Sequence, residues 1–319
     1  MGSGRCSIPA RRCIMRTRNL ITVVPAGFVT CVLVVLCLAQ NGWAWGNDGH
    51  QIVARVAAMN LSVKARRNVA KLLGVSSNPT SVANAMAKAA TWPDTFLRNH
   101  APKTKPWHFV DICRGAQVTG GNLDPFCPGG QCITKKIEAY RENIPKKQFD
   151  EFGGKGDLSL LIHFVGDIHQ PLHCTTNADR GGNCVSVEKV HSDNLHSAWD
   201  TDLVKEVEAG SSIEETADQL NEDFQDNPTD DSFDWSTGSS VDIALESSAL
   251  AEQEIYKPLH IAKQACVVEL AKCTEAPAAV QNLDIKLEPD YVDDASAVVR
   301  TQLTKAGIRL ANLLNSMWP

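Results

Sequence analysis

LLIHFVGDIHQPLH, residues 160–173, is an apolar run that also carries three histidines and an aspartate. Its apolar residues are typical of a buried helix. His163 and Asp167 are four residues apart and therefore share one face of that helix. The proline that follows ends or kinks the helix, so His173 lies at or just beyond its end, and His169 points away from the shared face. Burying this many titratable groups is costly unless each finds a partner.

The same pairing of histidine and aspartate recurs along the chain. NLHSAWD, residues 194–200, places His196 and Asp200 one helical turn apart. Further histidines and aspartates stand in GNDGH, TWPD and PWHFVD, as His50, Asp94 and His108. A single buried histidine is usually a hydrogen-bonded core residue, but the recurrence weakens that interpretation. Imidazole and carboxylate ligands without thiolates suit a zinc ion that performs hydrolysis, so the pattern predicts a metal site.

The first 44 residues differ from the rest and predict a secretory signal peptide. They contain five arginines, no acidic residue and an apolar stretch from Leu20 to Ala39. Gly42 and Ala44 are small residues at the −3 and −1 positions of a cut before Trp45. The alternative is an uncleaved membrane anchor, because the apolar run is almost long enough to span a bilayer. We expect removal, a single domain over residues 45–319, and a secreted protein.

Removal of the leader makes the chain strongly acidic. The whole chain carries 31 basic and 37 acidic residues, and loss of five arginines leaves 26 against 37, a net charge of −11. This argues against a general binder of duplex DNA, which needs a basic face. It does not exclude a nucleic-acid enzyme whose positive charge comes from metal ions.

Seven of the eleven cysteines remain after the leader, and in an exported protein they indicate disulfides. Cys127 and Cys132 would close a small loop, and the residues between Cys174 and Cys184 form another. Cys266 and Cys273 are too far apart on a helix to pair, so one of them is expected to reach Cys113. One thiol stays unassigned, and spacing does not decide the pairing.

The mature chain is predicted to be a mainly helical, all-α domain with few short strands. Helical periodicity covers most of it, and Asp48 is a plausible N-cap of the first helix. Loops are expected near 98–106, 114–133, 174–192 and 225–238, and short extended pieces at WHFVDI and CVSVEKV. Asn60-Leu61-Ser62 is a glycosylation sequon. The expected helices span 48–61, 62–73, 81–90, 134–143, 160–173, 194–209, 213–224, 240–256 and 294–318.

These motifs, in this order, resemble the zinc-dependent class I nucleases, a family of single-strand nucleases and 3′-nucleotidases of the S-one/P-one type. The resemblance rests on WGNDGH, WPD, WHFVD, HFVGDIHQPLH, DRGGN and NLHSAWD, and on VVRTQLTKAGIRLANLLN near the end of the chain. It covers nearly the whole mature chain. The family implies a helical fold related to bacterial zinc phospholipase C and a site that holds three zinc ions.

The resemblance also implies which residues hold each ion. Asp94, His108, His163 and Asp167 would bind the first zinc, and His173, His196 and Asp200 the second. Trp45, through its free amine and carbonyl oxygen, would bind the third with His50, and Asp167 would bridge it to the first. Only a cut before Trp45 creates that amine.

The implied reaction is in-line attack of a zinc-held hydroxide on phosphorus, which leaves a 5′-phosphate, with Asp94 and Asp167 in the catalytic centre. The family has an arginine three residues after the aspartate that matches Asp94. Here Leu97 stands there and Arg98 follows, so Arg98 is the candidate to stabilise the transition state; alternatively it is a surface charge.

Three further residues are expected to contact substrate. Phe109 matches a residue that stacks on a base, and Asp111 one that accepts hydrogen bonds from base edges. Stacking requires an unstacked base, which predicts a preference for single strands. Asn183 in DRGGN is a candidate substrate contact near the second zinc. The alternatives are a core position for Phe109 and a purely structural turn for DRGGN.

Two other functions compete with a nuclease. Zinc phospholipase C typically has glutamate where Asp200 stands here, so the motifs favour nucleic acid over phospholipid. An exported metal-binding protein without activity is the second alternative, but no expected ligand is missing. The expected partner is a single-stranded nucleic acid or nucleotide, and the protein is expected to be a monomer without a membrane anchor. The balance between endonuclease and 3′-nucleotidase activity stays open.

Overall fold

The computed structural model describes residues 45–226, 235 and 238–319. The predicted leader, and most of the predicted loop at 225–238, lie outside the described residues. The described chain is mainly helical with two short strands, which confirms the predicted fold class. Within these ranges no helix combines the length and apolar character needed to cross a membrane.

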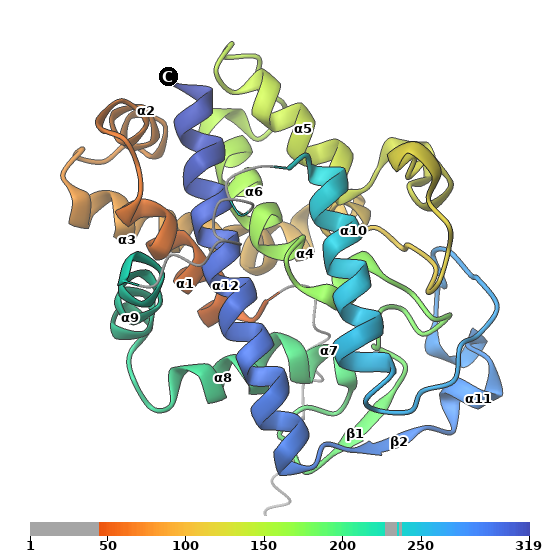
Figure 1. Cartoon of the computed structure of the whole chain (residues 1–319). Coiled ribbons are helices and arrows are strands. Elements are labelled where there is room, and N and C mark those ends of the chain that lie inside the picture. The colour runs from red at the N-terminus through yellow and green to blue at the C-terminus, as the bar shows by residue number, and fades with distance from the viewer. Residues whose placement is uncertain (1–44, 227–234, 236–237) are drawn as a thin grey trace, which may run out of the picture. The chain divides into compact units, whose positions relative to one another are not determined.

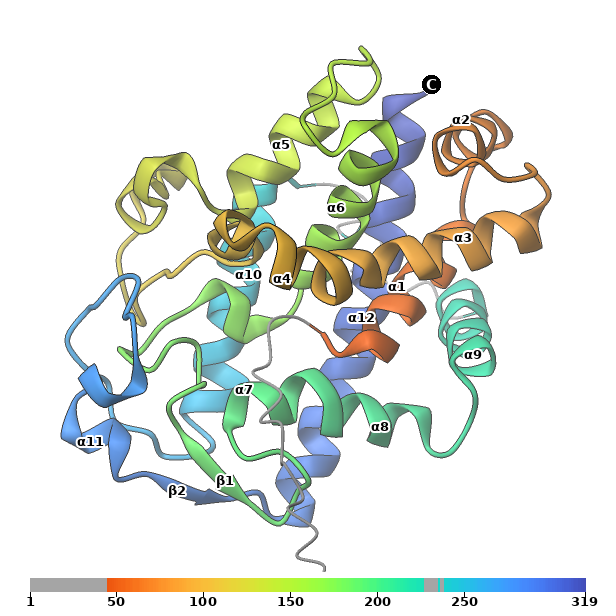
Figure 2. The same cartoon turned by 180° about the vertical axis from the view of Figure 1, so that it is seen from behind.

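Helix α6 (Gly153–Asp167) contains the histidine-rich stretch and is enclosed by other helices. It contacts α3 (Pro79–Trp92), α5 (Ile133–Asn143) and α12 (Pro289–Met317), which surround it in Figures 1 and 2. Every residue of α6 from Gly156 onward is buried. Its polar side chains must therefore be satisfied by neighbouring groups or by a ligand.

The N-terminal helices pack against this centre. Helix α1 (Asn47–Met59) contacts α3, α12 and α9 (Ile213–Asp226), while α2 (Val63–Leu73) covers α3. The expectation that Asp48 caps α1 is wrong, because the N-cap is Gly46 and Asp48 lies in the first turn. The Gly46 amide instead donates a hydrogen bond of 2.7 Å to the carbonyl oxygen of Asp200, which ties the start of the helix to a distant segment.

In the described part of the chain, three helices run into a π-helical segment, in which each turn holds one extra residue. Helix α3 leads into Pro93–Leu97 and the short α4 (Arg98–His100). Helix α7 (Leu195–Ser197) leads into Ala198–Asp202 and α8 (Leu203–Glu208). Helix α10 (Ser240–Leu250) continues as Ala251–Tyr256. Asp94 and Asp200 both lie in such segments, which often mark functional sites.

The two strands form a small parallel pair beside the short α11 (Ala278–Gln281). Strand β1 (Ser186–Glu188) lies within the predicted CVSVEKV segment, whereas its partner β2 (Asp284–Lys286) was not predicted. WHFVDI is not a strand, because its first two residues, Trp107 and His108, belong to a 3-10 helix, Pro102–His108. The predicted loop at 98–106 is therefore α4 and part of this 3-10 helix.

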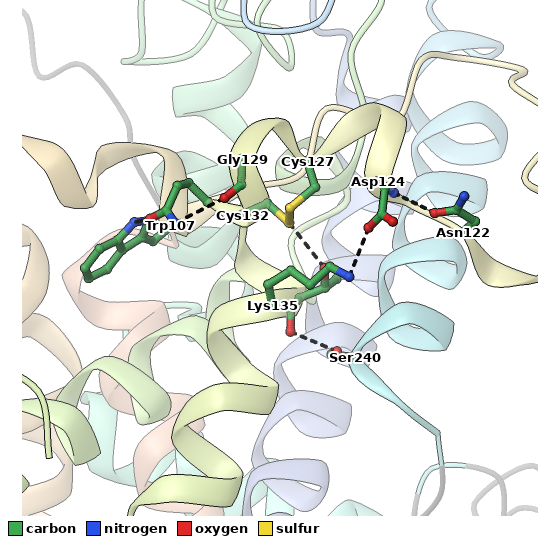
Figure 3. The surroundings of a disulfide bond; sticks show 10 residues. Trp107, Asn122, Asp124, Cys127, Gly129, Cys132, Lys135 and Ser240 are labelled. Carbon is green, nitrogen blue, oxygen red and sulfur yellow. Dashed lines mark hydrogen bonds and ion pairs between the residues drawn. A yellow bond between two sulfur atoms is a disulfide. The ribbon is translucent and has the colours of Figure 1, made fainter. Parts of the chain in front are cut away.

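Three disulfides join six of the seven described cysteines. Cys127–Cys132 closes the small loop as expected, and Cys266 is the residue that reaches Cys113. Around the first of these bonds Lys135 pairs with Asp124 at 3.0 Å, as Figure 3 shows. The expectation that Cys174 and Cys184 enclose a second disulfide loop is wrong. Cys184 bonds to Cys273, and Cys174 is a buried free thiol.

Candidate active site

The first cluster gathers Asp94, His108, His163 and Asp167. The Asp167 Oδ2 atom lies 3.0 Å from His108 Nδ1 and 3.2 Å from His163 Nε2. Asp94 Oδ1 lies 3.6 Å from His163 Nε2 and 4.0 Å from His108 Nδ1. The ligand atoms of three side chains, Asp94, His108 and His163, lie close enough together to hold a metal ion.

A second group shares His163 and Asp167 with the first and adds His50 from α1. The other oxygen of Asp167, Oδ1, lies 3.2 Å from His50 Nε2, and the rings of His50 and His163 stack with centroids 3.9 Å apart. Gly166 permits this approach, since a Cβ atom there would lie 2.8 Å from His50 Nδ1. Trp45 donates from Nε1 to the Gly166 carbonyl oxygen at 2.9 Å, which places the first described residue beside α6.

The third group gathers His173, His196 and Asp200. Asp200 Oδ2 lies 3.3 Å from His196 Nε2, and Asp200 Oδ1 lies 3.9 Å from His173 Nε2. The two imidazole rings stack with centroids 4.9 Å apart. Gln170, which the sequence analysis did not single out, donates to Asp200 Oδ1 at 2.6 Å and so orients the carboxylate.

Backbone carbonyls fix the orientation of three of these rings. Nδ1 of His163 donates to the carbonyl oxygen of Ala90 at 2.7 Å. Nδ1 of His173 donates to that of His108 at 2.9 Å, and Nδ1 of His196 donates to that of Gly181 at 2.6 Å. A carbonyl oxygen can only accept, so each Nδ1 carries a proton and each Nε2 is the nitrogen that faces its cluster. Hydrogen bonds of this kind, made by the nitrogen that faces away from the metal, hold metal-ligating histidines in place. DRGGN therefore supplies, through Gly181, an orienting carbonyl for His196.

Several atoms in these clusters are buried without a partner. Among the described residues, both ring nitrogens of His50, Oδ1 of Asp167, Nε2 of His173 and Oδ2 of Asp200 have no hydrogen-bond partner. Leaving buried polar atoms unpaired is costly, and native proteins rarely do so. Lone pairs that converge in this way fit the requirements of metal cations, which would satisfy them together.

The electrostatics of the clusters point the same way. Burial lowers the pKa of His196 to about 3 and raises that of Asp200 well above its usual range. Burial, helped by the charge on His163, lowers the pKa of His50 to about 4. Burial disfavours the charged form of His163, but the carboxylates of Asp167 and Asp94 outweigh it and raise its pKa to about 9. A cation would restore charge to Asp200, bind the neutral imidazoles of His50 and His196, and displace the proton from His163.

A pocket of about 220 Å³ opens beside the third group. All three residues predicted to contact substrate line it, together with His173 and His196. Asp111 Oδ2 accepts a hydrogen bond of 2.9 Å from the backbone amide of Glu269, and burial raises the pKa of Asp111 to about 6. The lining residues are Lys105, Pro106, Phe109, Asp111, Leu172, His173, Arg180, Gly181, Asn183, His196, Glu269 and Leu270.

The sequence analysis missed part of this lining. Arg180 lies inside the DRGGN motif and was readable there as a cation near the site, whereas nothing in the sequence around Glu269 and Leu270 marks them. The predicted Arg98 begins α4 directly after the π-helical segment of Asp94, and its side chain lies outside the described residues. Leu97, which stands at the family's arginine position, is buried.

Comparison with known proteins accounts for this arrangement. A family model described as S1/P1 nuclease matches residues 45–318. The chain belongs to the S1/P1 nuclease family. Nuclease S1 of Aspergillus oryzae is 29% identical over 289 residues, which cover 88% of this chain and 94% of that protein. Nuclease P1 of Penicillium citrinum is 28% identical over 281 residues, covering 86% and 97%. Endonuclease 2 of Arabidopsis thaliana is 27% identical over 297 residues, covering 89% and 94%.

Membership of the S1/P1 nuclease family confirms the resemblance drawn from the motifs and the prediction of a nucleic-acid hydrolase. The matched relatives are named as nucleases and endonucleases, and this chain aligns with most of the length of each. The match to the family model begins at Trp45, the first residue after the predicted leader.

Proposed function

We propose that the mature chain is a secreted phosphodiesterase that hydrolyses single-stranded DNA and RNA to products with 5′-phosphates, and that it also accepts 3′-nucleotides. The observation that carries this proposal is that the third histidine–aspartate group and the 220 Å³ pocket share two residues. His173 and His196 belong to the third histidine–aspartate group and also line the pocket that contains Phe109 and Asp111. A nucleotide with its base in the pocket therefore has its phosphate near the metal ligands.

Three zinc ions are proposed as the cofactor. Asp94, His108, His163 and Asp167 would hold the first, and His173, His196 and Asp200 the second. His50 and Asp167, with the amine and carbonyl of Trp45, would hold the third. When bound, zinc lowers the pKa of water to about 7 and stabilises the charge that develops on phosphate oxygens. The convergent lone pairs and unpaired buried atoms of these side chains support the assignment.

The residues of the pocket would position the substrate. Phe109 would stack on a base, and Asp111, whose Oδ2 is held by the Glu269 amide, would accept hydrogen bonds from the base edge through its remaining lone pairs. Asn183 donates from Nδ2 to the carbonyl of Arg180 at 2.8 Å, which leaves its amide oxygen available to substrate. A base inside a duplex cannot enter such a pocket, so single strands are preferred.

Removal of residues 1–44 forms part of this proposal. A free amine on Trp45 exists only after a cut at that bond. The hydrogen bond from Gly46 to the Asp200 carbonyl and that from the Trp45 ring to Gly166 hold this end of the chain against the metal-binding segments. Arg98 is proposed to stabilise the transition state, from its place directly after the segment of Asp94.

The test compares two substrates on the purified secreted protein, with its N-terminus and zinc content determined first. We expect single-stranded DNA to yield 5′-nucleotides, a chelator to abolish the release, and zinc to restore it. Cleavage of phosphatidylcholine alone would move the protein to the phospholipase branch of the fold. Activity on neither substrate, in a zinc-loaded protein that starts at Trp45, would refute the proposal of an enzyme.

A further inference from the structure

A second and larger hollow lies between α2, α3 and the start of α6. It has a volume of about 1050 Å³ and shares no lining residue with the pocket at the metal clusters. Figure 2 shows α3 crossing in front of α6 at this place, with α2 near the first turns of α3. We call it the α3–α6 groove; its lining residues come from 73–76, 81–95 and 152–159.

The charge of the α3–α6 groove is opposite to that of the chain. Its lining contains Lys88 and Lys155 and no aspartate or glutamate, although acidic residues outnumber basic ones in the sequence. Both lysines are exposed, and neither forms an ion pair with another described residue. The nearby Lys103, by contrast, is paired with Glu151. Two unpaired cations without a carboxylate between them favour an anionic ligand.

The same groove presents aromatic surface. Trp92 and Phe152 line it and are only partly buried, with ring centroids 6.2 Å apart at an interplanar angle of 76°. Trp92 also stacks on Phe96, whose side chain is 46% exposed. Lysines interleaved with aromatic rings, and with small hydroxyl and amide side chains between them, are how proteins hold single-stranded nucleic acid without reading its sequence.

The groove also borders the chain segment that contains Asp94. Trp92, the last residue of α3, and Thr95, in the π-helical segment of Asp94, both line it. We propose that the α3–α6 groove binds the part of a single strand that extends beyond the nucleotide being cleaved. Lys88 and Lys155 contact phosphates, and Trp92 and Phe152 stack on bases.

This inference rests on the proposed function, so its test separates the two. The variant Lys88→Glu/Lys155→Glu is compared with wild type on a strand of about 20 nucleotides and on a dinucleotide, which is too short to reach from the metal centre along the groove. The matched control is Lys147→Glu/Lys286→Glu, which reverses two exposed lysines outside both hollows.

Each phosphate contact on a single strand contributes about 0.7 to the slope of log affinity against log salt, or about fivefold at 0.1 M salt. We therefore expect KM for the long strand to rise about 25-fold and the salt slope to fall by about 1.4. The dinucleotide kinetics and the control variant should stay at wild-type values. Equilibrium binding of a fluorescent strand, measured by anisotropy in an Asp94→Asn background, should show the same loss without any cleavage.

Unchanged KM and unchanged strand binding in the double variant would overturn the groove assignment while the nuclease stands. An equal loss on the dinucleotide would also overturn it, because the lysines would then act at the reaction centre or on folding. Loss of binding to phosphatidylserine vesicles, with strand binding intact, would assign the groove to an anionic membrane surface instead. A wild type inactive on both substrates would refute the proposed function, and anisotropy would still test the groove.

Discussion

Asp167 connects two of the histidine–aspartate groups through a single carboxylate. Its Oδ2 faces His108 and His163, and its Oδ1 faces His50. The side chain is fully buried. Burial alone raises the pKa of a carboxyl, but the charge of His163 and the hydrogen bonds from His108 and His163 outweigh this and lower the pKa of Asp167 well below its usual range. The group is therefore a buried anion, which needs cations on both sides.

Replacing Asp167 with asparagine removes that charge and keeps the shape. We expect kcat on single-stranded DNA to fall at least about 100-fold, because even residues that only hydrogen-bond to a metal ligand contribute 10–100-fold. Zinc content per chain, measured by mass spectrometry, should fall in parallel. The control is Asp157→Asn, which alters a buried carboxyl group on the same helix outside all three groups. If both variants lose zinc equally, the loss reflects the folding of α6 and not ligation.

Asp111 makes the pocket sensitive to pH. Burial raises its pKa to about 6, so the carboxyl is ionised above pH 6 and protonated below it. Only the ionised form accepts hydrogen bonds at both oxygens. We expect KM for a nucleotide substrate to rise as pH falls from 7 to 5, beyond any change in an Asp111→Asn variant. The ratio of the two KM values isolates Asp111 from histidines that titrate in the same range. A ratio constant with pH would contradict the role given to this carboxyl.

At the scale of residues, the sequence predicts what repeats at helical spacing and misses what comes from distant loops. His163 with Asp167 and His196 with Asp200 are pairs four residues apart, and both meet as their spacing requires. Gln170 lies within the HQPLH motif, but its hydrogen bond to Asp200 depends on the fold, which the sequence does not show. Glu269 reaches Asp111 from 158 residues away and through its backbone, so its side chain carries no signal.

Among the elements, the segment that contains Glu269 and Leu270 depends on two disulfides. Cys113–Cys266 ties it to the chain two residues after Asp111, and Cys184–Cys273 ties it beside Asn183. The segment has no regular secondary structure between these bonds. The covalent links therefore replace helix packing in holding one wall of the substrate pocket.

Removing Cys113–Cys266 should affect both stability and the pocket. In the chain-entropy model, a link across 153 residues contributes about 5 kcal/mol, against about 2 kcal/mol for Cys127–Cys132 across 5 residues. We expect Cys113→Ser/Cys266→Ser to lose more stability in urea than Cys127→Ser/Cys132→Ser, and to raise KM. Zinc content should stay unchanged in both, since no cysteine belongs to the three groups. Equal KM in the two variants would show that the wall does not depend on its link.

Element prediction succeeded where periodicity persists and failed where backbone geometry departs from it. The helices around α6 follow the apolar spacing, whereas the π-helical turns that contain Asp94 and Asp200 are invisible to it. A π-helical turn changes the direction of a side chain without changing the sequence pattern. Strand β2 was not predicted, because it has only three residues, which show no periodic pattern, and it pairs with a strand 98 positions earlier. WHFVDI failed for the opposite reason, because its residues favour a strand but the first two of them complete a 3-10 helix.

At the scale of the whole molecule, the three histidine–aspartate groups join segments that are distant in sequence. His50 comes from α1, Asp94 from the end of α3, His163 and Asp167 from α6, and the last pair from the α7–α8 stretch. These segments form the centre of the described chain, and their convergence leaves buried polar atoms unpaired. Bound cations would therefore stabilise the fold as well as the reaction, because they bind only the native arrangement.

Chelation should therefore lower the melting temperature as well as the activity. A ligand at 1,000 times its Kd stabilises the native state by about 4 kcal/mol, and about 1 kcal/mol shifts Tm by about 2 °C in a chain of this size. With several ions we expect a fall of at least about 10 °C by scanning calorimetry on chelation, reversed by zinc. The shift should be smaller in Asp167→Asn, since that variant has already lost a shared ligand. A chelated protein that keeps its Tm while losing all activity would show that helix packing alone holds these segments. The unpaired buried atoms would then lower the stability of the fold and be retained only because the reaction needs them.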